Sequence, residues 1–277
     1  MAQGNGIHDA SLYSGSAAYY ARGRIPYPSA LADRLTDELG LDGSGRLLDV
    51  GCGPGSFTLL LATKFAQVTG IDADADMLEE ANRLGAGAGA TNVEWVHLRA
   101  EDLPAGLGTF RTVSFAQSFH WLDRPRVAEA VHGLLEEGGV CLHVHATTHE
   151  GIDTDLALPH PQPPRGAITR LVQRYLGPVR RAGQGYLADG PPSGEADVYR
   201  AAGFTGPRCI EVPGPLVTRT VDDLVAGVFS VSSSAPHLFG NRRAAFEAEL
   251  RQLLLDADPA GTFTEQMRPT AVDIWRV

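Results

Sequence analysis

The sequence predicts an α/β protein built on a doubly wound, mostly parallel β-sheet. Two observations support this fold class. Short apolar runs of strand length alternate with segments of helical apolar spacing through the first half of the chain, which is the pattern of repeated strand–helix units. A glycine-rich turn directly follows the first of these apolar runs, at the position where such sheets bind a ligand.

The alternation follows a first helix predicted at 28–39, where leucines recur at helical spacing. Short apolar runs predict five strands, at 46–50, 67–72, 93–98, 111–117 and 139–146. Helical spacing between them predicts helices at 56–66, 74–84 and 124–135. Residues 85–90 are rich in Gly and Ala and are predicted to be a loop.

The regular alternation stops at 148–192, a segment rich in Pro and Gly with one helical stretch at 168–175. Long excursions in α/β enzymes are often lids or substrate loops, and a tolerated surface insertion is the alternative. Later patterns predict helices at 195–202, 221–229 and 242–255 and strands at 204–212 and 271–277. We expect a single domain over 1–277, with an N-terminal cap segment (1–40), a cofactor-binding core (41–147), the lid or insertion (148–192), and a C-terminal part that completes the sheet and supplies substrate-pocket helices (193–277).

The turn at 47–55 reads Leu-Leu-Asp-Val-Gly-Cys-Gly-Pro-Gly, a strand that runs into three alternating glycines. Glycine lets a backbone approach a ligand where a Cβ would collide with it. Asp72 ends the next apolar run, at the distance expected for a carboxylate that binds a ribose diol. The segment therefore predicts a nucleoside-cofactor site. A dinucleotide fingerprint would place its third glycine where this chain has Ser56, and Asp49 suits a cationic ligand better than a pyrophosphate, so the pattern disfavours NAD.

This turn resembles motif I of the class I S-adenosylmethionine (SAM) methyltransferases, and three later segments resemble further motifs of that family in the same order. Residues 70–78 resemble the second motif, 99–104 the adenine-contacting loop, and 135–140 the turn before the fifth strand. The resemblance implies a seven-stranded, Rossmann-like sheet with an insertion after strand five. It also implies SAM as the cofactor and S-adenosylhomocysteine as its product.

The resemblance and the sheet geometry together assign the cofactor contacts. Asp72 would accept hydrogen bonds from the ribose hydroxyls, and Glu101 or Asp102 would accept one from the adenine amine. Family members often have Asp or Gly where this chain has Arg99, so the choice between those two carboxylates stays open. Met77 is expected either to cover the adenine or to belong to the core. The expected cofactor residues are Asp49, Gly51, Cys52, Gly53, Gly55, Asp72, Ala73, Met77, Ala100, Glu101, Asp102 and Gln117.

The end of the predicted fourth strand reads Ala-Gln-Ser-Phe-His-Trp at 116–121. This A-Q-x-x-H-W pattern, with R-x-x-Y-P at 24–28, resembles a subgroup that includes trans-aconitate methyltransferase-like proteins. Methyl transfer from a sulfonium needs an aligned nucleophile and, for a hydroxyl acceptor, removal of a proton. His120 is therefore the expected catalytic residue, and a structural role is the alternative. The expected substrate contacts are Tyr20, Trp121, His145 and His149.

Three histidines follow one another near the end of the predicted fifth strand. His143 and His145 share a face of that strand, and His149 comes just beyond it. Two imidazoles on one face could hold a metal ion. Because the only carboxylate at close spacing is Glu150, we expect no metal here, and pocket lining, a second base and core packing are the readings left open.

The composition disfavours several classes of function. Net charge is −10 and Lys64 is the only lysine, so the chain lacks the basic patch of a nucleic-acid-binding protein. No run of eighteen apolar residues and no signal-peptide pattern is present, so we expect no membrane contact. Three scattered cysteines favour a reducing, cytoplasmic location. A small-molecule acceptor is the expected partner, and a homodimer is left open.

The sequence thus predicts a SAM-dependent methyltransferase that acts on a small molecule, with oxygen favoured over nitrogen or carbon as the acceptor atom. No N-P-P-Y or D-P-P-Y follows strand four, which lowers the case for nitrogen. Three alternatives remain. The chain could bind SAM and catalyse a rearrangement or cyclisation without methyl transfer, it could be a nicotinamide oxidoreductase, or it could be a non-catalytic SAM-binding module.

Overall fold

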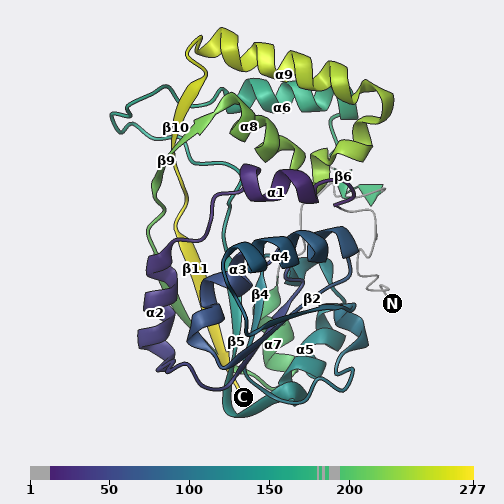
Figure 1. Cartoon of the computed structure of the whole chain (residues 1–277), viewed down its shortest axis with the longest axis vertical. Helices are drawn as coiled ribbons and strands as arrows, with labels where there is room; N and C mark the ends of the chain where they lie inside the picture. The colour runs from purple at the N-terminus through teal and green to yellow at the C-terminus, as the bar shows by residue number, and fades with distance from the viewer. Residues whose placement is uncertain (1–12, 180, 183–184, 187–193) are drawn as a thin grey trace.

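A seven-stranded sheet forms one part of the molecule, and a layer of helices forms the other (Figure 1). The computed structural model describes residues 13–179, 181–182, 185–186 and 194–277. The sheet has the strand order β3-β2-β1-β4-β5-β11-β8, in which the first five strands are parallel and β11 is antiparallel to both neighbours. The predicted fold class and the seven strands are confirmed. The strands are β1 Arg46–Val50, β2 Gln67–Asp72, β3 Val93–His97, β4 Phe110–Ala116, β5 Leu135–His145, β8 Thr205–Val212 and β11 Thr270–Arg276.

Helices cover both faces of the sheet because its central strands are apolar on both sides. On β5, Leu142 and Val144 pack under α2 (Ser29–Leu39) and α3 (Ser56–Leu61). Cys141, on the opposite face, packs with residues of α5 (Arg124–Leu134) and α7 (Glu195–Ala201). This alternation follows from the two-residue period of a strand. Further elements of this part are α4 Ala75–Gly87 and the short 3₁₀ helices η1 Ala62–Lys64, η2 Ala100–Asp102 and η3 Phe119–Trp121.

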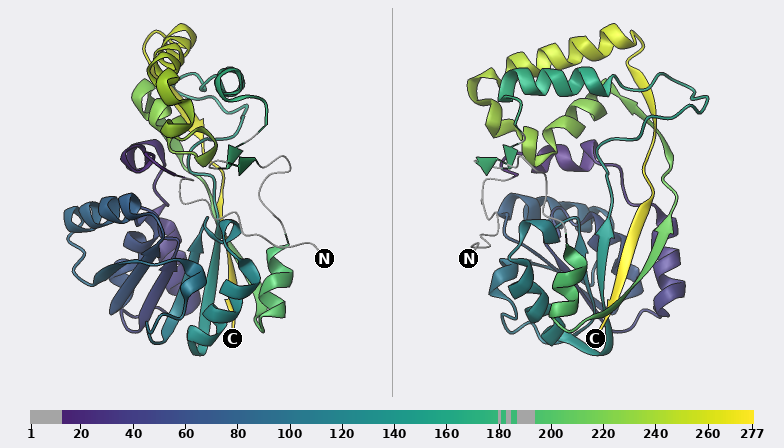
Figure 2. Two further views of the ribbon diagram at one scale, coloured as in Figure 1. Left: turned by 90° about the vertical axis from the view of Figure 1, so that its right-hand side faces the viewer. Right: turned by 180° about the vertical axis from the view of Figure 1, so that it is seen from behind.

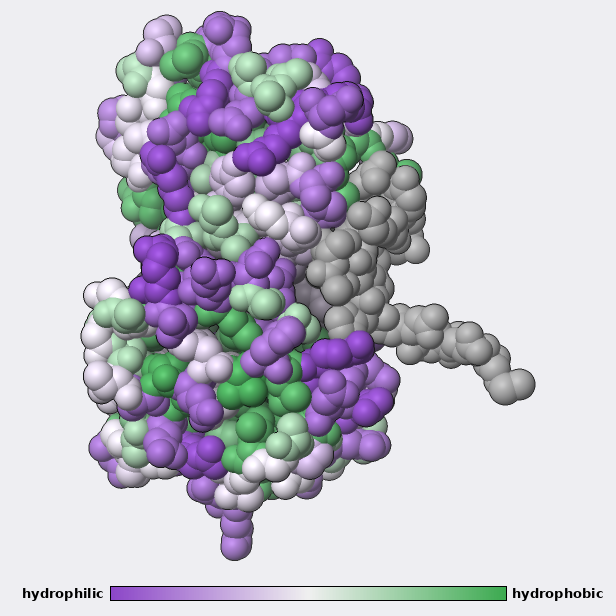
Figure 3. Space-filling model, turned by 45° about the vertical axis from the view of Figure 1, so that its right-hand side comes forward, coloured by the Kyte–Doolittle hydropathy of each residue, from purple (hydrophilic) through white to green (hydrophobic). Residues whose placement is uncertain are grey.

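The second part is a helical layer that lies above the ends of β1, β4 and β5 (Figures 1 and 2). Its core is aromatic and aliphatic, with Phe229, Phe246 and Phe263 fully buried. Polar side chains gather where the two parts meet on the face shown in Figure 3. The layer comprises α1 Ala17–Gly23, α6 Arg165–Leu176, α8 Val221–Phe229, η4 Ser232–Ser234, η5 Pro236–Arg242 and α9 Arg243–Ala257, with the antiparallel ribbon of β9 Leu216–Thr220 and β10 Thr262–Gln266.

Several boundaries differ from the predicted ones, each for a local reason. The first residues of the predicted loop at 85–90 form the last turn of α4, because the helical hydrogen bonding continues through this Ala- and Gly-rich stretch to Gly87. Strand β5 starts at Leu135 rather than at 139. Leu135 already pairs with Phe110 of β4, and a register shift after this pair takes up the extra residues of β5 before Val140 pairs with Thr112. The predicted helix at 56–66 ends as α3 at Leu61 and continues as 3₁₀ turn η1.

Other elements were not predicted at all. The ribbon of β9 and β10 and the helix α1 have no counterpart in the sequence-based assignment. Part of the expected cap (1–12) and part of the expected lid (180, 183–184 and 187–193) lie outside the described residues. Within the expected lid, α6 joins the helical layer, and a two-residue ribbon pairs β6 Arg181–Ala182 with β7 Gly185–Tyr186. Among the described helices, none combines the length and the hydropathy needed to cross a membrane.

Candidate active site

A cavity of about 970 Å³, open to solvent, lies where β1, β2 and β4 end. Five chain segments meet in it, because the carboxyl ends of parallel strands share one edge of the sheet. Helix α1 closes it from the side of the helical layer through Tyr20. We call it the first cavity. Its lining consists of Tyr13, Tyr20, Gly51, Cys52, Gly53, Asp72, Ala73, Asp74, Met77, Leu98, Ala100, Glu101, Ala116, Gln117, Ser118, Trp121 and Leu122.

The three glycines of the β1–α3 turn differ in what surrounds them. All have positive φ, which disfavours any side chain. A Cβ on Gly51 would lie 2.6 Å from Cβ of Ser118, and one on Gly55 would lie 2.4 Å from the ring of Trp95. A Cβ on Gly53 would meet nothing within 4 Å. Gly55 therefore serves the packing of the turn against Trp95 and does not line the cavity, whereas Gly53 presents bare backbone to the open space.

Asp72 is oriented by the backbone before any ligand arrives. Its Oδ2 accepts a hydrogen bond from the N–H of Gly53 at 2.7 Å, and its Oδ1 accepts one from the N–H of Asp74 at 2.9 Å. Burial raises the pKa of Asp72, and these two hydrogen bonds oppose that rise. Each carboxylate oxygen has a further lone pair, so the side chain can still accept hydrogen bonds from a diol in the cavity.

Asp49 occupies a different place from the one predicted. Its side chain is fully buried beneath the turn and does not line the cavity. Its two oxygens accept hydrogen bonds from the hydroxyls of Thr58 (2.6 Å) and Ser114 (2.7 Å). Burial raises the pKa of Asp49 to about 6, and the two hydroxyls oppose that rise. The residue thus ties β1 to α3 and β4, one layer below the cavity.

The far end of the first cavity is apolar with one carboxylate. Met77, Leu98 and Ala100 line it together with Glu101. The other acidic candidate, Asp102, is exposed and does not line the cavity, so the structure distinguishes the two residues that the sequence left open. Glu101 is held in place because its Oε1 accepts a hydrogen bond from the N–H of Asp123 at 3.1 Å.

Some lining residues were not in the predicted set. These are Tyr13, Asp74, Leu98, Ala116, Ser118 and Leu122. Asp74 carried a readable signal, because an Asp followed by a helical segment is a helix N-cap, and it does cap α4 by accepting from the N–H groups of Asp76 and Met77. The apolar ones look like any core position in the sequence, so no pattern distinguishes them.

His120 lies beside a second cavity rather than in the first. This cavity, of about 950 Å³, opens next to the end of β4 and shares Gln117 with the first. Gln117 has a positive φ of 62°, rare for a residue with a side chain, and its Nε2 donates to the hydroxyl of Tyr27 at 2.8 Å. The lining consists of Gln117, His120, His143, Val144, His145, Ala146, Thr147, Glu195, Arg268, Pro269 and Ala271. Trp121, in contrast, lines the first cavity.

The two histidines of β5 differ in their surroundings. His143 is buried, and its Nδ1 lies 3.2 Å from the hydroxyl of Tyr199. Burial, with His145 and His120 nearby, lowers the pKa of His143 to about 3. His145 is exposed to the cavity and stacks on His143, with 4.5 Å between ring centroids. Its Nε2 lies 3.1 Å from Oδ2 of Asp273, a carboxylate that is far away in the sequence. Among the described residues, no three His, Cys, Asp or Glu side chains are arranged to hold a metal ion.

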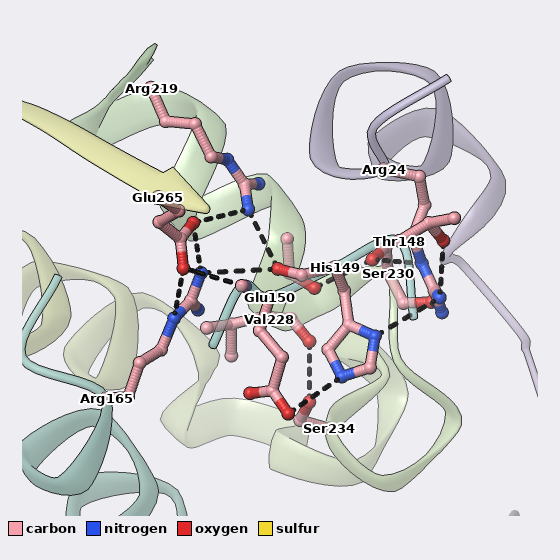
Figure 4. Close-up of polar contacts among 12 residues, drawn as sticks. Arg24, Thr148, His149, Glu150, Arg165, Arg219, Val228, Ser230, Ser234 and Glu265 are labelled. Atoms are coloured by element: carbon pink, nitrogen blue, oxygen red, sulfur yellow. Dashed lines mark hydrogen bonds and ion pairs between the residues drawn. The ribbon is translucent and has the colours of Figure 1, made fainter. Parts of the chain in front are cut away.

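His149 lines neither of these cavities and belongs to a polar network in the helical layer (Figure 4). Nη1 of Arg24 lies 3.4 Å from its Nδ1, and Oε1 of Glu150 lies 3.8 Å from its Nε2. Beside it, Glu265 lies between the guanidinium groups of Arg165 and Arg219. The structure therefore does not bring His149 to the other expected substrate residues. It borders a third cavity, between α6 and α8.

Comparison with known proteins agrees with this geometry. Residues 47–139 match the family model of a methyltransferase domain. The chain is 34% identical over 108 residues to the ubiquinone/menaquinone biosynthesis C-methyltransferase of Desulfotalea psychrophila. This match covers 38% of this chain and 43% of that protein. The chain is also 34% identical over 110 residues to a trans-aconitate 2-methyltransferase of Rhodopseudomonas palustris. That match covers 38% of this chain and 40% of that protein.

Among solved structures, the fold is similar to that of a proposed type II methyltransferase from Anaeromyxobacter dehalogenans. The TM-score is 0.51 at 22% identity, over 91% of this chain and 96% of that one. At this identity the likeness concerns the fold alone. The sequence matches span less than half the length of the two curated relatives. The family model stops at residue 139, before the helical-layer elements that follow β5.

Proposed function

We propose that this chain, whose residues 47–139 form a class I SAM-dependent methyltransferase domain, transfers a methyl group from SAM to a small-molecule acceptor, with oxygen as the acceptor atom. The observation that carries the proposal is the convergence of the expected cofactor residues on one cavity. Gly51, Gly53, Asp72, Met77 and Glu101 come from separate segments of the chain and line the same space.

The chemistry of the first cavity fits SAM. Asp72 suits the ribose diol, and the apolar end with Glu101 suits an adenine whose amine donates a hydrogen bond. The described lining includes the carboxyl groups of Asp72, Asp74 and Glu101 and no Lys or Arg. Such a lining favours a ligand with a sulfonium cation and disfavours one with a pyrophosphate. SAM, when bound, supplies an activated methyl group, and the residues described above position it.

The second cavity is the proposed acceptor site. It shares Gln117 with the first cavity, so an acceptor there would lie next to the cofactor at the end of β4. It is also lined by the imidazoles of His120 and His145, a kind of side chain that can act as a base toward a hydroxyl group, which supports oxygen as the acceptor atom. His120 remains a proposed acceptor contact there, and Tyr20 and Trp121 remain proposed contacts on the side of the first cavity.

Two measurements test this function. Isothermal titration calorimetry of the full chain should show binding of SAM and of S-adenosylhomocysteine and no competition by NAD. The chain should then be incubated with radiolabelled SAM and single compounds from a panel of phenols, aliphatic alcohols, carboxylic acids and amines. One S-adenosylhomocysteine per methylated product supports the proposal. Product formed without S-adenosylhomocysteine would point to a rearrangement, and a chain that binds no SAM would exclude the proposed function.

A further inference from the structure

The contact between His145 and Asp273 fixes which ring nitrogen of His145 carries hydrogen. His145 ends β5, and Asp273 lies on β11, the antiparallel strand beside it. Nε2 of His145 is 3.1 Å from Oδ2 of Asp273. An ionised carboxylate can only accept a hydrogen bond, so Nε2 must be the donor. Nδ1 of a neutral His145 is then the nitrogen with a free lone pair.

The ring of His145 is also fixed by its stacking on His143. The two rings lie 4.5 Å apart at an angle of 10°. His143 is itself held through its Nδ1, which lies 3.2 Å from the hydroxyl of the fully buried Tyr199. Because burial keeps the pKa of His143 near 3, that ring stays neutral when its neighbour takes up a proton. A protonated His145 would therefore face an uncharged aromatic ring rather than a second cation.

We propose that His145 is the general base of methyl transfer and that Asp273 is its positioning residue. This inference rests on the proposed function. The acceptor hydroxyl gives its proton to Nδ1 of His145 while an oxygen electron pair forms the bond to the methyl carbon. The carbon–sulfur bond of the donor breaks, and its electron pair stays on sulfur, which becomes the neutral thioether. The imidazolium of His145 then returns its proton to solvent.

Charged groups on every element around His145 are compatible with this role. Asp273 faces it from β11, His143 from β5, and His120 lines the same cavity from η3. Arg268, which precedes β11, and Glu195, which begins α7, also line this cavity. Two carboxylates, Asp273 in contact with His145 and Glu195 in the cavity lining, thus accompany the guanidinium of Arg268 around the imidazolium. Arg124 lies 3.9 Å from Glu195 and holds that carboxylate.

His149 does not meet the same requirements. A histidine that acts as the base needs a ring nitrogen with a free lone pair and must line the acceptor site. In His149 the Nδ1 lone pair faces the guanidinium of Arg24, a group that can only donate, and Nε2 faces Glu150. His149 also lines the third cavity and not the second.

The first arm of the test needs no acceptor. Long-range proton–nitrogen NMR of the chain labelled with ¹⁵N-histidine reports which ring nitrogen carries hydrogen, and His145→Ala assigns the signal. At a pH where an imidazole ring is neutral, wild-type His145 should be in the Nε2–H form. Asp273→Ala should shift it to a mixture of the Nε2–H and Nδ1–H forms. Wild-type His145 in the Nδ1–H form, in a chain that binds SAM, would overturn this inference and leave the proposed function intact.

The second arm uses turnover with the first panel compound that releases S-adenosylhomocysteine. His145→Ala should lower turnover by about 10²–10⁴ at unchanged SAM affinity. Imidazole added to the medium should restore part of that loss, because the cavity is open and a free base can replace the side chain. Asp273→Ala should cause a smaller loss and move the acidic limb of the pH profile. His160→Ala is the control, because this histidine lies on a loop and lines neither the first nor the second cavity.

The outcomes of the second arm are distinct. If turnover of His145→Ala equals the wild-type rate, or if imidazole rescues His120→Ala and not His145→Ala, His145 is not the base. If no panel compound is methylated although SAM binds, the NMR arm decides whether the base geometry is present.

Discussion

Two carboxylates at the ends of neighbouring strands perform different tasks in this protein. Asp72 faces the first cavity and is oriented by two backbone N–H groups, whereas Asp49 is buried and bound by two hydroxyls. Both were predicted as cofactor residues, Asp49 from its position just before the glycine turn and Asp72 from its place at the end of the next apolar run. The spacing shows that each residue is near the turn, but it does not show which way its side chain points. Thr58 and Ser114, which bind Asp49, are 9 and 65 positions away in the sequence.

Replacement of Asp72 by Ala should weaken SAM binding by about 1–3 kcal/mol, because hydrogen bonds to a charged acceptor are lost. The turn also loses the acceptor that holds the N–H of Gly53, so part of the effect is a less ordered site. Asp102→Ala is the matched control, since this carboxylate is close in sequence to Glu101 but does not line the cavity. Titration calorimetry of both variants checks the prediction, and equal affinities in the two would contradict it.

Asp49 should make the free energy of unfolding depend on pH. Its folded-state pKa of about 6 lies above the unfolded value of 3.8, so the folded state holds the proton more tightly. Stability from this group is complete below about pH 4 and is lost as pH rises through about 6, a difference of about 3 kcal/mol. Relative to wild type, Asp49→Asn should therefore gain stability between pH 4 and 7 and stay constant above. Urea unfolding at several pH values measures the difference, and a difference independent of pH would show that Asp49 is not protonated in that range.

The turn between β1 and α3 illustrates how one motif combines packing and binding. Gly53 and Gly55 have similar positive φ values, 54° and 80°, so replacement by Ala strains the backbone at both. Only at Gly55 would the added Cβ collide with another group, the ring of Trp95. The pattern of alternating glycines thus predicted the turn correctly, but the reason for Gly55 depends on Trp95 of β3, which the sequence cannot place in space.

Gly55→Ala should lower the free energy of unfolding by more than Gly53→Ala does, since a backbone cost of about 1–3 kcal/mol is common to both and the clash is not. Gly53→Ala should instead reduce SAM affinity, because its Cβ would enter the open space of the cavity. Chemical unfolding and calorimetry on the two variants provide the comparison. If Gly53→Ala is the less stable variant, the collision with Trp95 is not the deciding term.

The arginine pair around Glu265 connects elements that are far apart in the chain. Arg219 is almost completely buried, and it donates hydrogen bonds to three carbonyl groups. These belong to Gly23 of α1, to His149 in the segment after β5, and to Asp223 of α8. Glu265, on β10, is the only carboxylate drawn between Arg219 and Arg165 in Figure 4. None of this could be predicted from the sequence, because β9 and β10 are short, and their partners are about 46 positions apart.

Glu265→Gln should destabilise the chain by about 3–5 kcal/mol, because it leaves a buried guanidinium next to a second one. Glu80→Gln is the control, since its partner Arg83 is exposed and such pairs contribute 1 kcal/mol or less as a rough guide. Unfolding in urea measures both. A loss for Glu265→Gln as small as that of Glu80→Gln would mean that water or a rearranged side chain compensates Arg219.

The two parts of the molecule should respond together to the cofactor. Helix α1 belongs to the helical layer, yet its Tyr20 lines the first cavity with residues of the sheet. S-adenosylhomocysteine at a hundred times its dissociation constant should slow hydrogen exchange up to about 100-fold in any element whose opening releases the ligand. We expect this slowing in α1 and in the glycine turn and not in α9. Slowing confined to the sheet would mean that α1 does not close the site.

The sequence allowed prediction of the sheet far better than of the helical layer. Strands and helices of the core follow each other in order, so local patterns and the rules of α/β connections are sufficient. The helical layer takes α1 from the N-terminal region, α6 from the segment after β5, and α8, α9 and the ribbon from the last quarter of the chain. Its core forms between segments that have no local sign of their association.

The position of β11 has a consequence for how the chain acquires its fold during synthesis. This strand lies between β5 and β8, and β8 makes no ladder with β5 of its own. Strand β8 ends at Val212 and β11 begins at Thr270, so a ribosome must extend the chain by all the residues of α8 and α9 before the sheet can be completed. Until then the edge of β5 that carries His143 and His145 has no partner strand. Translation speed and chaperone contact in that interval should therefore influence the yield of active protein more than the stability of the finished fold does.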